Sequence, residues 1–255
     1  MKLSGIKKRF FAMRKCIICK KILKAEEKDT LFCPDCRLLW DVAKTESCDE
    51  CFQSAVECTC QSKEMAKEGS LCLRKLVFFE KGRKAYRVLR AMYLLKRKPH
   101  KRTEEFFASE IARAVNEELK TIGVDDVENE VLISYIPRTV RSKRKYGIDH
   151  SERMAMAISE KTGIPFAELI QRKQTFGRSQ KVLSRVKRFK NAKKQFEICH
   201  STGSEMVNKK YVFLYDDVVT TGASMSACIS LLRKSGAMGI ICLCIAHNQG
   251  KKKHQ

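Results

Sequence analysis

The sequence predicts an α/β fold, a mostly parallel sheet with helices on both faces, preceded by a small cysteine-rich domain. Short apolar runs at residues 73–79, 131–136, 211–215 and 240–245 have the length and composition of buried strands. Segments with helical spacing lie between these runs, and such alternation is typical of a parallel sheet that is covered on both sides. The cysteines gather ahead of the first strand, in a stretch with few large apolar residues.

Four helices are expected, at residues 83–95, 103–121, 151–161 and 224–234. Thr103 has the side chain of an N-cap for the second of them, and the glutamates that follow it suit a first helical turn. Gly123, Gly163 and Gly236 each follow the last apolar position of a helical segment, where glycine commonly ends a helix. The sequence therefore predicts where three of the four helices end.

The chain has 255 residues, enough for one good-sized domain and a small one. Lys and Arg number 52 against 29 Asp and Glu, a formal charge of +23, which favours a polyanionic partner over a merely solvated basic surface. No apolar run approaches the roughly 18 to 20 residues that a membrane span needs. The basic N-terminus lacks the apolar core of a signal peptide. We therefore expect a cytoplasmic protein, whose thiols stay reduced.

Eight of the 13 cysteines form four close pairs, three with two intervening residues and the last with one. Four thiolates suit one tetrahedral Zn²⁺ ion, so the pairs predict two structural zinc sites rather than disulfides or a redox centre. The sequence leaves open whether neighbouring pairs combine or interleave. The expected zinc domain spans residues 1–70, ahead of a domain at 71–250 and a basic tail at 251–255, and it should need metal to fold. The predicted ligands are Cys16, Cys19, Cys33, Cys36, Cys48, Cys51, Cys58 and Cys60.

The most informative stretch is residues 211–224, where an apolar strand delivers Asp216 and Asp217 to a hydroxyl-rich turn that precedes a helix. Carboxylates accept hydrogen bonds from hydroxyl groups, so the pair suits a sugar diol. Gly222 lets the backbone approach an anion closely, and the N–H groups at the start of a helix point at it. An ordinary turn would explain the aspartates alone. The full string predicts a site for a phosphorylated sugar at the carboxyl end of the strand.

The string at residues 214–222 resembles the fingerprint of type I phosphoribosyltransferases, which bind phosphoribosyl pyrophosphate (PRPP). The resemblance implies that Asp216 and Asp217 face the ribose hydroxyls and act in catalysis, with Mg²⁺ as the cofactor of PRPP. Arg138 and Arg141, which follow another expected strand, would hold the pyrophosphate side. The residues implied to wrap the 5-phosphate are Val218, Thr220, Thr221, Gly222, Ala223 and Ser224.

A double cysteine block followed by such a domain is similar to the ComF/GntX family, which includes proteins of competence and DNA uptake. The chain also has the family's linker pattern, Arg172-x2-Thr175-x4-Gln180-x2-Leu183-x4-Arg188-x2-Asn191-x4-Phe196. It departs from the family at residues 146–150, where Tyr-Gly-Ile-Asp-His stands in place of Arg-Gly-Phe-Asn-Gln. Arg144 or Lys145 could replace the lost arginine, although a lysine cannot form a bidentate guanidinium contact. The resemblance implies single-stranded DNA and a competence helicase as partners.

Positive charge concentrates at residues 138–145 and 172–194, and the second stretch holds ten Lys or Arg and no acid. That stretch is larger than one small ligand requires and predicts contacts with nucleic-acid phosphates. Phe176 and Phe189 within it could stack on bases or anchor a core. The candidate nucleic-acid contacts are Arg144, Lys145, Arg178, Lys181, Lys187, Arg188 and Lys190. Two functions stay open: PRPP binding with single-stranded DNA handling in uptake, or phosphoribosyl transfer to a base or nucleotide acceptor.

Overall fold

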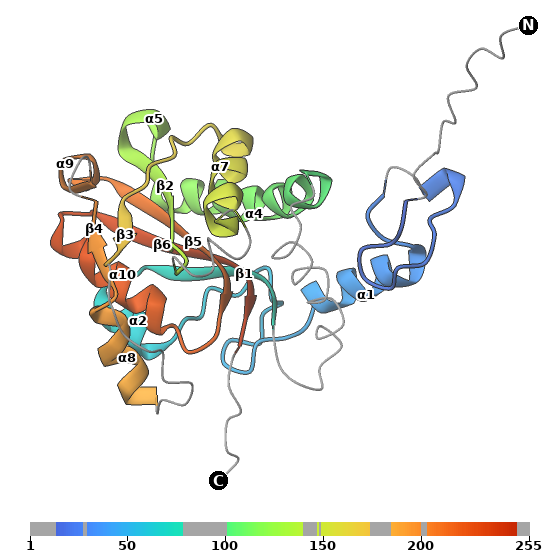
Figure 1. The fold of residues 1–255 in the computed structure, drawn as a ribbon, viewed down its shortest axis with the longest axis horizontal. Helices are drawn as coiled ribbons and strands as arrows, with labels where there is room; N and C mark the ends of the chain where they lie inside the picture. Colours follow the sequence, from blue (N-terminus) through green and yellow to red (C-terminus); the bar gives the residue numbers. More distant parts are fainter. Residues whose placement is uncertain are drawn as a thin grey trace, which may run out of the picture.

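The computed structural model describes residues 14–27, 30–78, 101–139, 147, 149–173, 185–199 and 203–248, and gives the backbone alone at 185–188, 203 and 204. At its centre lie four parallel strands in the order β1-β6-β5-β2 (Figure 1). The strands are β1 (Cys72–Phe78), β2 (Val131–Tyr135), β5 (Tyr211–Val219) and β6 (Gly239–His247). The expectation of a mostly parallel α/β sheet is confirmed.

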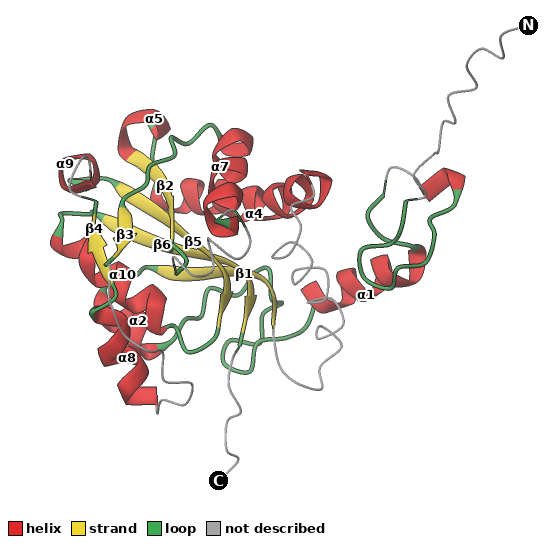
Figure 2. Ribbon diagram, in the orientation of Figure 1, coloured by secondary structure: helices red, strands yellow, loops and turns green. Residues whose placement is uncertain are grey.

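Each face of the sheet has its own hydrophobic core, because successive strand residues point to opposite sides. Ile133 and Phe213 belong to one core, with α4 (Lys101–Ile122) and α7 (His150–Thr162). Leu132 and Val212 belong to the other, with α2 (Lys63–Glu68) and α10 (Ala223–Lys234). Figure 2 shows these helices on the two sides of the yellow sheet. Both faces are covered, as a parallel sheet requires.

Several short elements complete the described chain. An antiparallel pair, β3 with β4, is joined to α8, and both α8 and β4 pack against α10. This unit occupies a stretch in which the sequence predicted basic charge but no element. The bounds are η1 (Ala25–Glu27), α1 (Pro34–Lys44), α5 (Val127–Glu130), β3 (Ile170–Arg172), α8 (Arg185–Lys193), β4 (Phe196–Ile198) and α9 (Gly203–Val207).

The structure corrects two expectations about element boundaries. Thr103 is not an N-cap, because α4 already begins at Lys101 and the threonine is buried in its first turn. Strand β5 does not end before Asp216 but continues to Val219, since its pairing with β6 runs on to His247. The helix ends at Gly123 and Gly163 lie where expected. The helix expected at residues 83–95 lies outside the described residues.

The cysteine-rich segment packs directly on the sheet domain. Trp40 of α1 lies with its ring centroid 5.7 Å from that of Phe106 and 5.5 Å from that of Phe107, both on α4. Further along, Phe78 of β1 packs against a small core that includes Cys58. The segment therefore shares cores with the sheet on two separate surfaces. Among the described residues, every helix is too short or too polar to cross a membrane.

Candidate functional site

The turn after β5 forms the floor of a cavity of about 250 Å³. Its lining includes Asp216 and continues from Val218 through the turn to Met225 at the start of α10. Gly222 is the N-cap of α10 and has φ +75°, a conformation that glycine adopts without strain. The start of a helix concentrates backbone N–H groups and positive dipole, so this cavity can receive an anion.

The two adjacent aspartates have different surroundings. Asp216 is half-buried and lines the cavity. Asp217 is buried at 2% exposure and forms an ion pair with Arg138. It also accepts a hydrogen bond of 3.2 Å from the Tyr215 hydroxyl, and His150 Nε2 lies 3.7 Å from its Oδ1. Asp216 thus lines the cavity, with its Oδ1 accepting from the backbone N–H of Asp217 at 2.9 Å, whereas Asp217 lies in a buried network of polar side chains.

Burial and the neighbouring carboxylates change the pKa of the Tyr215 phenol in this network. Desolvation raises the pKa of the Tyr215 phenol well above its ordinary value, and the charges of Asp217 and Asp216 raise it further. The phenol therefore stays protonated and can donate to Asp217. Because Arg138 and the Tyr215 hydroxyl both hold the Asp217 carboxylate, this side chain stabilises the end of β5.

Arg138 lies near its expected place but points to protein rather than to the cavity lining. Its guanidinium pairs with Asp217, and its backbone N–H donates to Asp149 Oδ2 at 2.9 Å. Asp149 also accepts from Ser151 N at 3.1 Å and so caps α7. Asp149, which stands where the resembled ComF/GntX pattern has Asn, therefore fixes the entry into α7. An Asp just before a helical segment is an N-cap signal that sequence reasoning could have used.

Three further residues line the cavity, Asn191, Ala192 and Gln195. The sequence assigned none of them to the site, because two neutral amides inside a strongly basic stretch give no local signal for ligand binding. They come from α8 and the turn that follows it, and Ala192 packs into the same core as α10. The cavity is thus formed by the turn after β5 together with the end of α8 and the turn that follows it.

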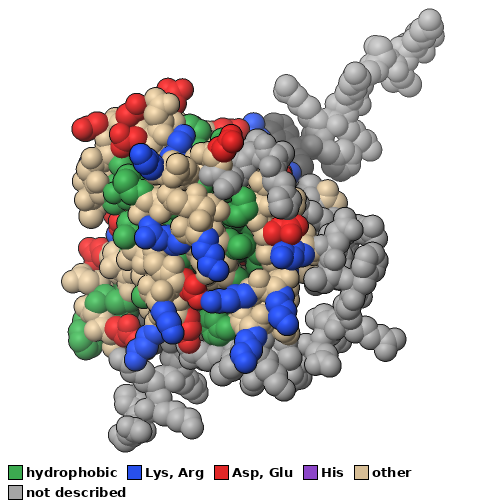
Figure 3. All heavy atoms as spheres, turned by 90° about the vertical axis from the view of Figure 1, so that its left-hand side faces the viewer, with side chains coloured by type: hydrophobic (Ala, Val, Ile, Leu, Met, Phe, Trp, Pro, Cys, Tyr) green, Lys and Arg blue, Asp and Glu red, His purple; other side chains and the backbone are tan. Residues whose placement is uncertain are grey.

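Three of the seven predicted nucleic-acid contacts lie on α8. Lys187 and Arg188 are residues of α8, for which the structure gives the backbone alone. Lys190 lies on the same helix, and its side chain is exposed. Figure 3 looks at the side of the molecule where α8, α10 and β4 lie and shows many Lys and Arg side chains there, with acids among them. Arg141, Arg144, Lys145, Arg178, Lys181 and Phe176 lie outside the described residues.

Of the two described aromatic residues near α8, Phe196 belongs to the core. Phe196 is 1% exposed, and the Arg172 guanidinium lies 4.4 Å from its ring centroid. Phe189 is half-buried on α8. Phe196 is therefore unavailable for base stacking, which leaves charge as the main argument for nucleic acid on this side.

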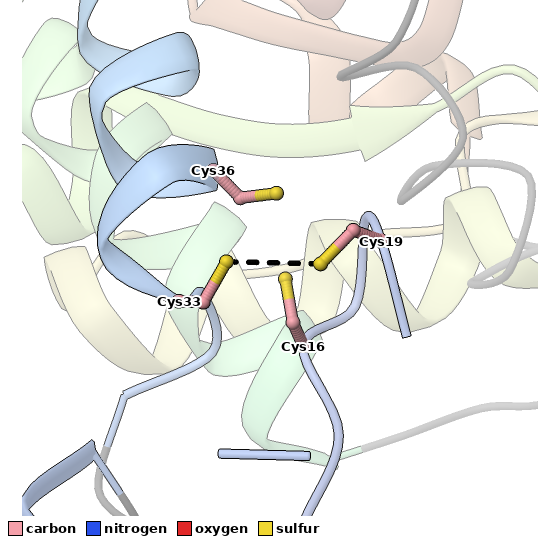
Figure 4. A group of neighbouring side chains, drawn as sticks. All are labelled: Cys16, Cys19, Cys33 and Cys36. Atoms are coloured by element: carbon pink, nitrogen blue, oxygen red, sulfur yellow. Dashed lines mark hydrogen bonds between the residues drawn. The ribbon is translucent and has the colours of Figure 1, made fainter. Parts of the chain in front are cut away.

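The first cysteine cluster combines two neighbouring pairs, Cys16 with Cys19 and Cys33 with Cys36 (Figure 4). The four sulfurs lie within 4.8 Å of one another, and Cys19 Sγ is 3.7 Å from Cys33 Sγ. Zn–S bonds of about 2.3 Å in a tetrahedron separate the sulfurs by about 3.8 Å, so the geometry fits zinc. Burial raises the pKa of the Cys16 thiol, but backbone N–H groups that donate to its sulfur lower the pKa overall to about 7.

The second cluster has the same donor set, Cys48, Cys51, Cys58 and Cys60, again within 4.8 Å. Burial acts against the Cys48 thiolate, yet backbone N–H groups, with Glu50 N at 3.4 Å, bring the thiol pKa to about 7. The shorter spacing of the last pair does not prevent the four sulfurs from converging. Both clusters can hold zinc, and neighbouring pairs combine in each, which settles the pairing that the sequence left open.

The second cluster also contacts the sheet through a cation. Lys75 of β1 is 1% exposed and donates to Cys58 Sγ at 3.1 Å and to Cys60 O at 2.8 Å. Sequence reasoning missed this residue, since a lysine within an apolar strand has no pattern that points to a cluster 15 to 17 residues earlier. A buried ammonium beside thiolates offsets their negative charge.

Comparison with known proteins gives one sequence match. The profile of the phosphoribosyl transferase domain matches residues 106–255. No curated protein matches the chain.

Similar solved structures include a glutamine PRPP amidotransferase from B. subtilis (18% identity over 55% of this chain and 25% of that chain, TM-score 0.35). Others are a purine phosphoribosyltransferase from Pyrococcus horikoshii (19%, 56% and 77%, TM-score 0.33) and a hypoxanthine phosphoribosyl transferase from Trypanosoma cruzi (13%, 60% and 68%, TM-score 0.36). The chain spans about a quarter of the length of the amidotransferase.

Proposed function

The chain belongs to the phosphoribosyl transferase domain family, whose profile covers more than half of it, and on that premise we propose that it binds PRPP and handles single-stranded DNA, as a ComF-type protein of DNA uptake. The observation that carries the first part is the cavity, in which a half-buried carboxylate and a helix-initiating turn face the same space. A ribose diol at Asp216 leaves the 5-phosphate at the turn, where N–H groups and hydroxyls can donate to it.

The roles of the remaining site residues follow from their surroundings. Val218, Thr220, Thr221, Gly222, Ala223 and Ser224 supply the phosphate turn. Asp217 and Arg138 hold the end of β5 to the loop after β2, and Arg141 completes the pyrophosphate side. Bound with PRPP, Mg²⁺ supplies positive charge to the pyrophosphate, and Asp216 is the cavity carboxylate that would hold it.

The cysteine clusters are proposed to be structural zinc sites. They belong to a metal-binding domain at residues 1–70, joined to the phosphoribosyltransferase-like domain at 71–250 and followed by a basic tail at 251–255. Closed sets of four thiolates leave no open coordination position for a substrate, so their contribution is folding free energy. Reduced thiols fit a cytoplasmic location.

The test of PRPP binding is calorimetric titration with PRPP and Mg²⁺. Replacement of Asp216 by Asn should weaken binding at least tenfold, because the amide donates where the ribose hydroxyls also donate. Asp125→Asn makes the same chemical change on an exposed surface and should leave the affinity unchanged. Absence of PRPP binding to the wild-type protein would refute the proposal.

The single-stranded DNA part rests on the charge of α8 and its neighbours. Each phosphate that the protein neutralises adds to the salt dependence, so affinity should fall steeply as salt rises. Charge reversal at Lys187, Arg188 and Lys190 should weaken DNA binding and flatten its salt dependence, while PRPP binding is largely kept. The matched variant reverses three exposed lysines on α4 and α7, namely Lys101, Lys120 and Lys161. Equal loss in both variants would contradict a DNA site at α8.

Phosphoribosyl transfer is the second candidate, and family membership favours it. Catalysis would use the same cavity, and the basic residues that follow β2 would stabilise the departing pyrophosphate. Its measurement is pyrophosphate release from PRPP in the presence of candidate bases or nucleic acid. Tight PRPP binding without turnover would leave the binding function and exclude the enzymatic one for the acceptors tested.

A further inference from the structure

The part of the cavity lining that comes from α8 and the turn after it carries two amide side chains. Asn191 lies in the last turn of α8 and Gln195 lies in the turn that follows the helix, and both line the cavity. Neither is needed to close a core, since Asn191 is exposed and Gln195 is half-buried. Their chemistry, rather than their volume, is what they bring to the site.

The orientation of the Gln195 amide is fixed by its neighbour. Arg172 Nη1 lies 2.6 Å from Gln195 Oε1. A guanidinium has only donors, so the amide atom that faces it must be the oxygen. The amide NH₂ group is therefore the part of Gln195 that remains for the cavity, and it can only donate.

Arg172 is itself held from three directions. Its Nε donates to Pro137 O at 2.8 Å, at the end of β2, and its guanidinium lies over the ring of Phe196. The neighbouring backbone ties the same place together, since Lys173 N donates to Gln195 O at 3.0 Å. Arg172 thus connects the sheet end, β4 and the cavity wall, and a shorter or less forked side chain could not make all these contacts.

We propose that Gln195, oriented by Arg172, and Asn191 form a donor wall for the phosphate group of the sugar ligand, opposite the turn after β5. The inference rests on the proposed function and adds to it the residues that select a phosphorylated over an unphosphorylated pentose. Amide donors on one wall and backbone donors on the other enclose a phosphate monoester, whose oxygens accept several hydrogen bonds at once. Arg172 is a positioning residue, because it acts through Gln195.

The decisive variants change the donor without removing the wall. Gln195→Glu keeps an oxygen for Arg172 and replaces the NH₂ group by a negative oxygen, so ribose 5-phosphate and PRPP should bind at least tenfold more weakly. Asn191→Asp makes the same change from α8 with no contact to Arg172 and should act in the same direction. Lys173→Gln is the control, because it lowers the net charge by the same one unit through an exposed side chain next to β3. This variant should change the affinity less than threefold.

A double-mutant cycle tests the positioning role of Arg172 by calorimetry. Arg172→Lys should weaken ribose 5-phosphate binding several-fold in the wild-type background and less than twofold in a Gln195→Ala background. Equal losses in the two backgrounds would show that Arg172 acts on the ligand by itself and would overturn its role through Gln195. Thermal unfolding of each variant, followed by circular dichroism, reports whether the fold is kept.

The outcomes separate this inference from the proposed function. Wild-type protein that binds neither PRPP nor ribose 5-phosphate overturns both. Wild-type protein that binds them, with unchanged affinity in Gln195→Glu and in Asn191→Asp, overturns the donor wall alone. Weakened binding in both amide variants, with Lys173→Gln unaffected, supports the wall.

Discussion

The two cysteine clusters have the same four-thiol donor set, but different forces join them to the sheet domain. The first cluster is attached through aromatic packing, with Trp40 of α1 against Phe106 and Phe107 of α4. The second cluster packs against Phe78 of β1 and has in addition a buried cation, Lys75 of β1, which donates to Cys58. Aromatic packing persists whatever the charge of the cluster. The contact between the Lys75 ammonium and the cysteine sulfurs depends on that charge.

This difference has consequences for metal loss. Four thiolates and one Zn²⁺ sum to −2, so a filled second site compensates Lys75 within a dry environment. The chain that leaves this cluster enters α2, where Ser62 is the N-cap and Met65 is buried. A Cβ on Gly222 would lie 2.9 Å from Ser62 Oγ and 3.0 Å from Met65 Sδ, so α2 abuts the phosphate turn. Loss of metal at the second cluster should therefore reach the ligand site, and loss at the first should not.

The largest expected effect comes from removal of the buried cation. Lys75→Met keeps the length of the side chain but leaves the thiolate centre without its partner, and we expect a loss of about 3–5 kcal/mol in unfolding free energy. Lys44→Met is the matched change on α1, the helix that carries Cys36 of the first cluster. Lys44 pairs with Glu110 at 2.8 Å, and Arg113 remains for that carboxylate, so the loss should be smaller.

Urea unfolding of the zinc-loaded variants measures this difference. If Lys75→Met is no more destabilising than Lys44→Met, the charge link between the second cluster and β1 is wrong. Zinc content determined on the same samples shows whether the Lys75 variant has lost its metal as well.

The next effect compares the metal sites directly. Cys58→Ser and Cys19→Ser each remove one thiol, from the second and the first cluster respectively. The first of these changes should weaken PRPP binding about tenfold, since α2 loses its anchor next to the phosphate turn. Cys19→Ser should change the affinity less than threefold. Calorimetry on samples of known zinc content is the measurement, and equal effects would rule out a special link from the second cluster.

A smaller effect is expected at the turn itself. Gly222 precedes α10 with φ +75°, and Gly163 follows α7 with φ +74°. Of the two, only Gly222 would place a Cβ against α2. Alanine in this left-handed region costs about 1–2 kcal/mol at either position. Gly222→Ala should in addition weaken PRPP binding several-fold, whereas Gly163→Ala should not. An unchanged PRPP affinity in Gly222→Ala would show that α2 and the turn are not in firm contact.

Much of the fold could be predicted because its signals are local. The strands at residues 131–135 and 239–247 are continuous apolar runs, and Gly123 and Gly163 end helices by their backbone freedom alone. The turn after β5 could be found for the same reason, since the carboxylate and the glycine stand within seven residues of each other.

The rest of the site depends on contacts between distant parts of the chain. Gln195, which lines the cavity, accepts a hydrogen bond from Arg172, 23 residues earlier. Asp216 and Asp217 look equivalent in the sequence, and only the pairing of β5 with β6 shows that they lie in a strand and face opposite sides. Arg138, the ion-pair partner of the buried Asp217, is 79 residues away. Such distances leave no local pattern.

The smallest expected effect concerns charge near the first cluster. Asp35 lies 3.4 Å from Lys21, and both side chains are well exposed, at 78% and 69%. Solvent and salt screen such a pair, so Asp35→Asn should change the unfolding free energy by less than about 1 kcal/mol. Zinc content and PRPP affinity should also stay unchanged.

The measurement is the same urea unfolding, repeated at low and at high salt. A large loss in Asp35→Asn would mean that charge stabilises the first cluster as well, and the contrast with Lys75 would disappear. A negligible loss, with a large one at Lys75, would show that the two clusters differ in burial of their charges. The same four-thiol donor set would then depend on aromatic packing for its attachment in the first cluster and on a buried charge in the second.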